Sequence, residues 1–114
     1  MPVTTTTPMM TPVCQTCSLS TIQLTPMMGA GTIDVQNGGV SVGANGCNQL
    51  TVTCNAGAGN TAFMQFNTNQ GGPDMAMGQV VTAMLTCDGN GNWIYTGMNG
   101  QSRVITEVNC VATM

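Results

Sequence analysis

The sequence predicts an all-β fold: a disulfide-stapled β-sandwich of immunoglobulin-like or Greek-key type, preceded by an extended N-terminal Thr/Pro arm. Three observations predict it. Apolar and polar residues alternate in short runs, Gly and Asn clusters separate these runs, and six cysteines are spread over the 114 residues. No window shows sustained helical spacing of apolar residues. Seven or eight short strands at such intervals are typical of a β-sandwich.

The chain divides into two regions. We expect residues 1–13 to form an extended Thr/Pro-rich arm or linker, and residues 14–114 to form one six-cysteine β-sandwich domain. Proline fixes its own φ angle and disfavours helical geometry in the residue before it, so the arm should be extended. Threonine between prolines is also typical of O-glycosylated stalks. The candidate glycosylation sites are therefore Thr4, Thr5, Thr6 and Thr7.

The first strands are expected soon after the second cysteine. Residues 18–25 are rich in β-forming side chains, and residues 32–36 alternate between polar and apolar. The sequence Asn37-Gly38-Gly39 then indicates a hairpin turn, after which residues 40–42 resume the alternation.

Three central runs show the clearest alternation, in residues 50–54, 62–66 and 81–87. Because successive side chains of a strand point to opposite faces, every second residue should face the core. The expected inward residues are Leu50, Val52, Cys54, Ala62, Met64, Phe66, Val81, Ala83, Leu85 and Cys87.

The C-terminal part predicts two more strands. The Gly/Asn-rich residues 88–91 indicate a turn before a strand at 92–96, and residues 98–101 indicate a turn before a strand at 103–108. The side chains expected on the inward side of this last segment are Val104, Thr106, Val108 and Cys110.

Six cysteines in a short chain indicate an oxidising compartment and a disulfide framework, so we expect a secreted, extracellular protein. Cys14 and Cys17 have the spacing of a zinc ribbon. A zinc site would need a second close cysteine pair or histidines, and the sequence has neither. We therefore expect disulfides and no cofactor or metal.

The scarcity of charge excludes several classes of function. Charged residues make up 4% of the chain and the net charge is -3, whereas a typical domain has about 25% charged residues. Without a basic patch the protein should bind neither nucleic acid nor anionic membrane surfaces. No apolar run reaches the roughly 18 residues that a membrane-spanning helix needs. We expect no membrane insertion.

Catalysis is not expected either. The chain has no His or Lys, and its four carboxylates, Asp34, Asp74, Asp88 and Glu107, lie in separate segments. General acid–base chemistry would have few groups to use. Asp88 lies in a Gly/Asn run that resembles a calcium loop, but a bidentate Glu is missing, so a turn is favoured. The sequence therefore predicts a protein that is not an enzyme.

Methionine is unusually frequent, with 11 residues. The clusters Met9-Met10, Met27-Met28 and Met75-Ala-Met77 would suit copper(I), which prefers thioethers, and a secreted metal-handling protein is one hypothesis. Methionine more often fills irregular cores or adaptable interfaces. Since most of these residues are flanked by Pro or Gly, we favour an interface.

The cysteine pattern, with the segments Leu85-Thr-Cys-Asp-Gly-Asn-Gly-Asn-Trp-Ile-Tyr-Thr-Gly97 and Ile105-Thr-Glu-Val-Asn-Cys110, resembles the nematode six-cysteine (C-six) extracellular domain family. The resemblance covers residues 14–110. It implies an extracellular domain that is commonly joined to others by Thr-rich linkers, and it implies no enzymatic activity.

The resemblance also implies a disulfide between Cys14 and Cys47. Three pairings of the other four cysteines then remain. We favour Cys54–Cys87, because both residues are expected at inward-facing strand ends, and this choice leaves Cys17–Cys110.

Two hypotheses of function follow. In the first, the domain self-associates head to tail into an extracellular filament, the arm adding a strand to a neighbouring subunit whose edges carry little charge to prevent it. The expected assembly interface is Thr4, Thr5, Thr6, Thr7, Pro8, Met9, Met10, Thr11 and Pro12. In the second, the domain is an adhesion or carbohydrate-binding module on a glycosylated spacer, with Trp93 contacting sugars.

Overall fold

The computed structural model describes residues 13–29, 31–67 and 71–113, so the predicted arm lies outside the described residues except for Val13. In these ranges the chain is all-β, as predicted, with two short 3-10 turns and ten strands. The elements are η1 Val13–Gln15, η2 Leu19–Thr21, β1 Gln23–Leu24, β2 Thr32–Ile33, β3 Gln36–Val42, β4 Asn48–Asn55, β5 Thr61–Phe66, β6 Met77–Gly78, β7 Val80–Cys87, β8 Trp93–Thr96, β9 Ser102–Val104 and β10 Glu107–Thr113. None of the helical segments in these ranges is long and apolar enough to span a membrane.

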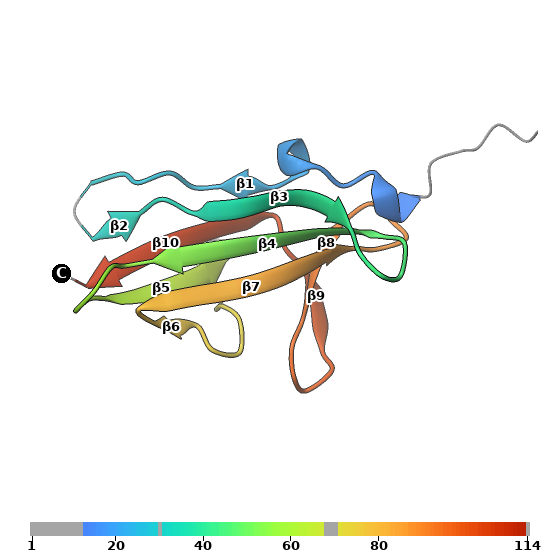
Figure 1. The fold of residues 1–114 in the computed structure, drawn as a ribbon. Helices are drawn as coiled ribbons and strands as arrows, with labels where there is room; N and C mark the ends of the chain where they lie inside the picture. The colour runs from blue at the N-terminus through green and yellow to red at the C-terminus, as the bar shows by residue number, and fades with distance from the viewer. Residues whose placement is uncertain (1–12, 30, 68–70, 114) are drawn as a thin grey trace, which may run out of the picture.

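The strands form two five-stranded sheets that pack face to face (Figure 1). The first sheet has the order β1-β10-β5-β6, and β2 also pairs with β10. The second sheet has the order β3-β4-β7-β8-β9. β5 and β10 are antiparallel over six residue pairs, and β4 and β7 over seven, so these four strands form the centre of the sandwich.

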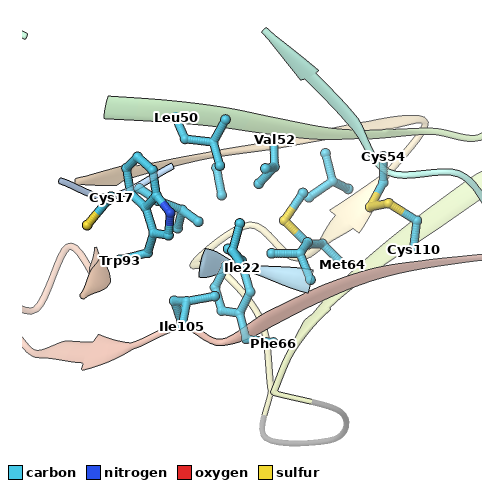
Figure 2. Close-up of a cluster of buried hydrophobic side chains, with 14 of the residues drawn as sticks. Cys17, Ile22, Leu50, Val52, Cys54, Met64, Phe66, Trp93, Ile105 and Cys110 are labelled. Carbon is cyan, nitrogen blue, oxygen red and sulfur yellow. A yellow bond between two sulfur atoms is a disulfide. The ribbon is translucent and has the colours of Figure 1, made fainter. Parts of the chain in front are cut away.

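The core lies between the two sheets and uses the inward residues that alternation predicts. In β4 the burial alternates along the whole strand, and β5 and β7 follow the same pattern. All ten side chains predicted to face inward in these strands are at most 4% exposed. Figure 2 shows this cluster, with Leu50, Val52, Met64, Phe66 and Trp93 meeting between the sheets. Burial of each large apolar side chain contributes roughly 1.5–3 kcal/mol.

All six cysteines form disulfides, and the bond between Cys14 and Cys47 is the predicted one. The other two predicted pairings are wrong: the structure has Cys17–Cys87 and Cys54–Cys110. β4 and β7 are antiparallel neighbours, and Cys54 lies opposite Val81. Cys87 is six residues farther along β7, about 20 Å away at ~3.3 Å per residue.

Cys110 instead faces Cys54 from the opposite sheet. It lies on β10, and the two Cα atoms are 5.4 Å apart, so their disulfide joins the sheets through the core (Figure 2). Cys17 precedes η2 and bonds to the last residue of β7, at 5.8 Å between Cα atoms. The predicted Cys17–Cys110 bond is therefore replaced by one that ties the N-terminal segment to the second sheet.

The prediction of a hairpin turn at Asn37-Gly38-Gly39 is wrong. β3 runs through it as one strand, and its pairing with β4 shifts between Asn37 and Val40, which makes the segment a β-bulge. The bulge is possible because Gly39 has a φ of 84°, which glycine adopts without strain. The predicted strand at 32–36 is instead divided between the sheets, with β2 pairing to β10 and β3 pairing to β4.

The predicted strand at 103–108 is also divided. β9 ends at Val104 in the second sheet and β10 begins at Glu107 in the first, so the chain crosses between the sheets. This crossing inverts the alternation: Ile105 is 1% exposed, whereas Val104 and Thr106 are exposed. The inward positions predicted for Val104 and Thr106 are thus wrong.

Candidate functional site

The described residues offer two surfaces on which a function can be built: an unpaired strand edge and a polar pocket. The strand edge belongs to β7. On one side β7 pairs with β4 over Val80–Thr86, without a register shift. On the other side it pairs with β8 only through Thr86 and Cys87. Residues 80–85 therefore have no strand partner on that side in the described part of the chain, and we call them the open edge of β7.

The open edge of β7 is uncharged. Its outward side chains are Val80 and Met84, each 52% exposed, with Thr82 between them. Its inward side chains are buried under the first sheet, so an added strand would continue both sheet and core. Proteins usually protect such edges with Lys, Pro or bulges. Here the bulge protects β3, at the opposite edge of the same sheet, and nothing comparable interrupts β7.

The predicted assembly interface, residues 4–12, lies outside the described residues, as do the candidate glycosylation sites. The structure does place the point from which this segment extends. Residues 13–17 are anchored by the Cys14 and Cys17 disulfides and by Asn48, whose Nδ2 donates to the Cys17 carbonyl at 2.9 Å. Because Cys17 bonds to Cys87, the arm extends from near the C-terminal end of β7.

The sequence Thr-Pro-Met-Met occurs at residues 7–10 and again at residues 25–28, and the second copy lies in the loop between β1 and β2. Met27 and Met28 are 60% and 76% exposed, and the Met27 N–H donates to Asp34 Oδ1 at 2.6 Å. This loop borders β10 on the side away from β5, whereas β7 packs near β5. The loop and the open edge of β7 are thus on opposite sides of the sandwich (Figure 1).

The polar pocket lies between the β8–β9 hairpin, which projects beyond the sandwich in Figure 1, and the segment that precedes β6. Its volume is about 260 Å³. Its walls combine polar side chains with bare backbone, and are formed by Gly72, Asp74, Tyr95, Gly97, Asn99, Gln101, Ser102 and Arg103.

Phe66 forms the apolar support of this pocket. Tyr95 and Arg103 are paired across the β8–β9 hairpin, so both point to the same face of it. The Tyr95 ring lies 5.3 Å from the Phe66 ring, and the Arg103 guanidinium lies 5.2 Å above the Phe66 ring centre. Arg103 Nη2 also donates to the Gly72 carbonyl at 3.0 Å. The single basic side chain of the sequence is thus positioned inside the pocket.

Asp74 is held in a fixed orientation on the facing wall. Its Oδ2 accepts the Tyr95 hydroxyl at 3.0 Å and the Met98 N–H at 2.7 Å, and its own N–H donates to Tyr95 Oη at 3.0 Å. In the sequence Asp74 is one of four carboxylates that lie in separate segments. Its partners lie more than 20 residues away, so no local pattern indicates them.

Two sequence-based interpretations are settled by the placement of the residues. Asp88 Oδ1 accepts the N–H groups of Asn90 and Asn92, each at 2.9 Å, which is the predicted turn arrangement. Trp93 is 2% exposed and donates through Nε1 to the Ser18 carbonyl at 3.1 Å. The expectation that Trp93 contacts sugars is therefore wrong, because its ring is part of the core.

The methionines are mostly at the surface. Met64 is buried in the core, and the other methionines of the described ranges are at least 52% exposed. Those exposed residues are Met27, Met28, Met75, Met77, Met84 and Met98. Within the same ranges no group of three or more His, Cys, Asp or Glu side chains is placed to hold a metal ion.

Two mostly antiparallel sheets define a six-cysteine β-sandwich domain, in which one disulfide joins the sheets and two tie the N-terminal segment to the start of β4 and the end of β7. A model of the C6 domain matches residues 14–110, and the chain belongs to the C6 domain family. It is also similar to an uncharacterised protein of Caenorhabditis elegans, with 46% identity over 90 residues. That match covers 77% of this chain and 34% of the relative, so the chain spans about a third of the relative's length. No solved structure matches the chain.

Proposed function

We propose that this protein is a non-enzymatic, secreted structural protein that assembles head to tail into an extracellular filament. In this assembly the N-terminal arm of one subunit adds as a strand to the open edge of β7 in the next subunit. The observation that carries the proposal is that edge: six uncharged residues, in regular register with β4 and without a strand partner of their own on the other side. Three disulfides support secretion, because such bonds persist in oxidising compartments.

The sequence of the arm suits this edge in length. The prolines at 2 and 8 delimit the run Val3-Thr4-Thr5-Thr6-Thr7, in which every residue has a backbone N–H. Five residues span about 17 Å at ~3.3 Å each, and the six residues of the open edge span about 20 Å. Thr and Val are also among the residues that favour strands. The prolines at either end would limit pairing to this run.

The energetics are those of strand addition. Backbone hydrogen bonds give affinity without sequence selectivity, and side chains in alternate positions give specificity. Each hydrogen bond contributes roughly 0.5–1.5 kcal/mol net, so a run of five residues supplies a few kcal/mol. The outward side chains are also of the same kind, because threonines of the arm would lie beside Thr82, which lies opposite Thr53 on β4.

A contact between an arm and a different surface is heterologous, and such contacts build open filaments unless a rotation closes them into rings. The arm extends from near the C-terminal end of β7. Its eleven residues from 2 to 12 could therefore also reach the open edge of β7 in their own subunit. An experiment on assembly must separate these two arrangements.

The test is sedimentation velocity and electron microscopy of the full chain, compared with a variant lacking residues 2–12. We expect filaments for the full chain and a folded monomer for the deletion. Thr5→Pro should also prevent assembly, because it removes a hydrogen-bond donor from the run, whereas Thr5→Val should not. Filaments that persist after the deletion would refute the proposal.

The acceptor edge is tested by a matched pair of lysine substitutions. Met84 and Thr51 lie directly opposite each other on β7 and β4, both exposed on the outer face of the sheet. Met84→Lys should block assembly, because Met84 is at the edge, and Thr51→Lys should leave it unchanged. The full chain could instead be a monomer in which the amides of residues 80–85 are protected from hydrogen exchange, and lose that protection when the arm is deleted. This result would show that the arm docks within its own subunit, and it would contradict the filament.

A further inference from the structure

We propose that the polar pocket beside the β8–β9 hairpin binds a small neutral saccharide, such as one sugar residue of a glycan. This site is separate from the open edge of β7 and does not depend on filament assembly. Trp93, the aromatic side chain expected to contact sugars, is buried. The pocket supplies a different set of residues for that chemistry, built on Tyr95, Arg103 and Asp74.

The charges of the pocket favour a neutral ligand. Its walls contain one guanidinium, of Arg103, and one carboxylate, of Asp74, so their formal charges cancel. The guanidinium would attract an anion and the carboxylate would repel it. For a cation the attraction and the repulsion are exchanged. The remaining side chains are neutral: the amides of Asn99 and Gln101 and the hydroxyls of Tyr95 and Ser102.

The hydrogen-bonding groups favour hydroxyls in particular. The guanidinium only donates, the carboxylate only accepts, and the amides do both. The Ser102 hydroxyl already bonds to Thr96 and the Asn99 Oδ1 accepts the Gln101 N–H. A ligand that bonds to the guanidinium, the carboxylate and the amide groups together must present closely spaced donors and acceptors, and a hydroxyl is both. Sugars carry such hydroxyls on neighbouring carbons. The Asp74 carboxylate is already fixed by Tyr95 and by the Met98 N–H, so little side-chain freedom is lost on binding.

The size and the rim of the pocket suit one sugar residue. The volume of about 260 Å³ lies just below the roughly 300–1,000 Å³ of pockets for drug-sized ligands. At the rim, Met75 is 78% and Met98 is 85% exposed, each next in sequence to a residue of the pocket wall. Flexible thioether side chains adapt to irregular apolar surfaces, such as the C–H face of a sugar ring. This gives two of the exposed methionines a role.

The close approach of backbone to the pocket depends on glycine. A Cβ at Gly97 would lie 3.0 Å from Asn99 Oδ1 and 3.2 Å from Asp74 Oδ1. Because Gly97 has no side chain, Asn99 Oδ1 and Asp74 Oδ1 can lie close to its backbone. The pocket is therefore held open by the sequence of the hairpin.

The test is a titration of ¹⁵N-labelled full chain with glucose, galactose, mannose and N-acetylglucosamine, followed by amide chemical shifts. We expect weak binding, with shifts confined to residues 72–74 and 95–103. Gln101→Ala should weaken binding about five- to tenfold, as expected for the loss of one hydrogen bond. Gln36→Ala, at an exposed glutamine on β3, is the matched control and should not change it.

Arg103→Gln provides a second variant and should abolish the shifts, with its fold checked from the unaffected amides of β4. Free glycine, a zwitterion, serves as a competing probe. Absence of shifts with all four sugars at tens of millimolar would overturn the proposal. So would shifts caused by glycine alone, or sugar-induced shifts that survive both Gln101→Ala and Arg103→Gln.

Discussion

The side-chain amide of Asn67 holds the backbone of Thr106, where the chain passes from the second sheet to the first. Its Oδ1 accepts the Thr106 N–H at 2.7 Å and the Thr106 hydroxyl at 3.1 Å, and its Nδ2 donates to the Val104 carbonyl at 2.8 Å. Asn67 has a φ of 52°, a left-handed conformation that Asn tolerates better than most residues. One side chain therefore joins the end of β5 to the crossing between β9 and β10.

Replacing this residue should destabilise the domain. Asn67→Ala leaves several backbone groups at the crossing without their partner, at a cost of roughly 1–3 kcal/mol per buried group. Since the crossing is partly exposed to water, we expect a total loss of about 2 kcal/mol in the free energy of unfolding by urea. Asn67→Asp keeps the acceptor oxygen and should lose only about 1 kcal/mol. Equal losses in the two variants would contradict this role of Oδ1.

The three disulfides should differ in their resistance to reduction. Cys14 and Cys47 are half-buried, whereas the other four cysteines are at most 4% exposed. Mild reduction without denaturant should therefore open Cys14–Cys47 first, as measured by alkylation and peptide mapping. The same maps test the pairing, and a peptide linking Cys54 to Cys87 would contradict it.

Replacing Cys17 and Cys87 by Ser removes a bridge over 70 residues. The free energy of unfolding should fall by about 4 kcal/mol.

The strand faces could be predicted where neighbours in sequence decide them. In β4, β5 and β7 the alternation is continuous, so burial of every second residue follows from local geometry alone. At residues 103–108 alternation predicts the wrong faces, because the crossing at Ile105 depends on which sheet each half joins. Periodicity carries no information about sheet membership. The glycines of β3 predict a turn where the structure has a bulge, because glycine permits either conformation.

The pairing of cysteines and the pocket required knowledge of the sheets. Two inward-facing cysteines can bond only if their strands oppose each other, and alternation shows that Cys54 and Cys87 face inward but not that β4 and β7 are neighbours. The pocket joins Gly72 and Asp74 to a hairpin more than 20 residues later. Its residues come from two short strands and from loops that are far apart in the sequence, so the sequence gives no local signal for it.

Gly72 should be intolerant of a side chain, unlike Gly89. A Cβ on Gly72 would lie 2.1 Å from the Met64 carbonyl oxygen, which is backbone and cannot move aside cheaply. Gly89 has nothing within 4 Å of the same position and no positive φ. Gly72→Ala should therefore lower the free energy of unfolding by about 1–3 kcal/mol, as overpacking does, and Gly89→Ala should leave it within about 0.5 kcal/mol. Thermal or urea unfolding of both variants checks the difference.

The hydrogen bond between Tyr95 and Asp74 should couple the hairpin to the segment before β6. Tyr95→Phe keeps the ring contact with Phe66 and removes only the hydroxyl, so its cost should be about 1 kcal/mol. Asp74→Ala removes the carboxylate that also accepts the Met98 N–H, and should cost somewhat more.

In the double variant the two losses should not add, because each single change already breaks the shared bond. A double-mutant cycle by urea unfolding should give a coupling energy of at least about 0.5 kcal/mol. Amide exchange of the turn at 97–101 should quicken in both single variants, since Met98 and Tyr95 connect that turn to Asp74. Additive losses would mean that the two side chains act independently, and the fixed orientation of the Asp74 carboxylate would then have to come from the Met98 N–H alone.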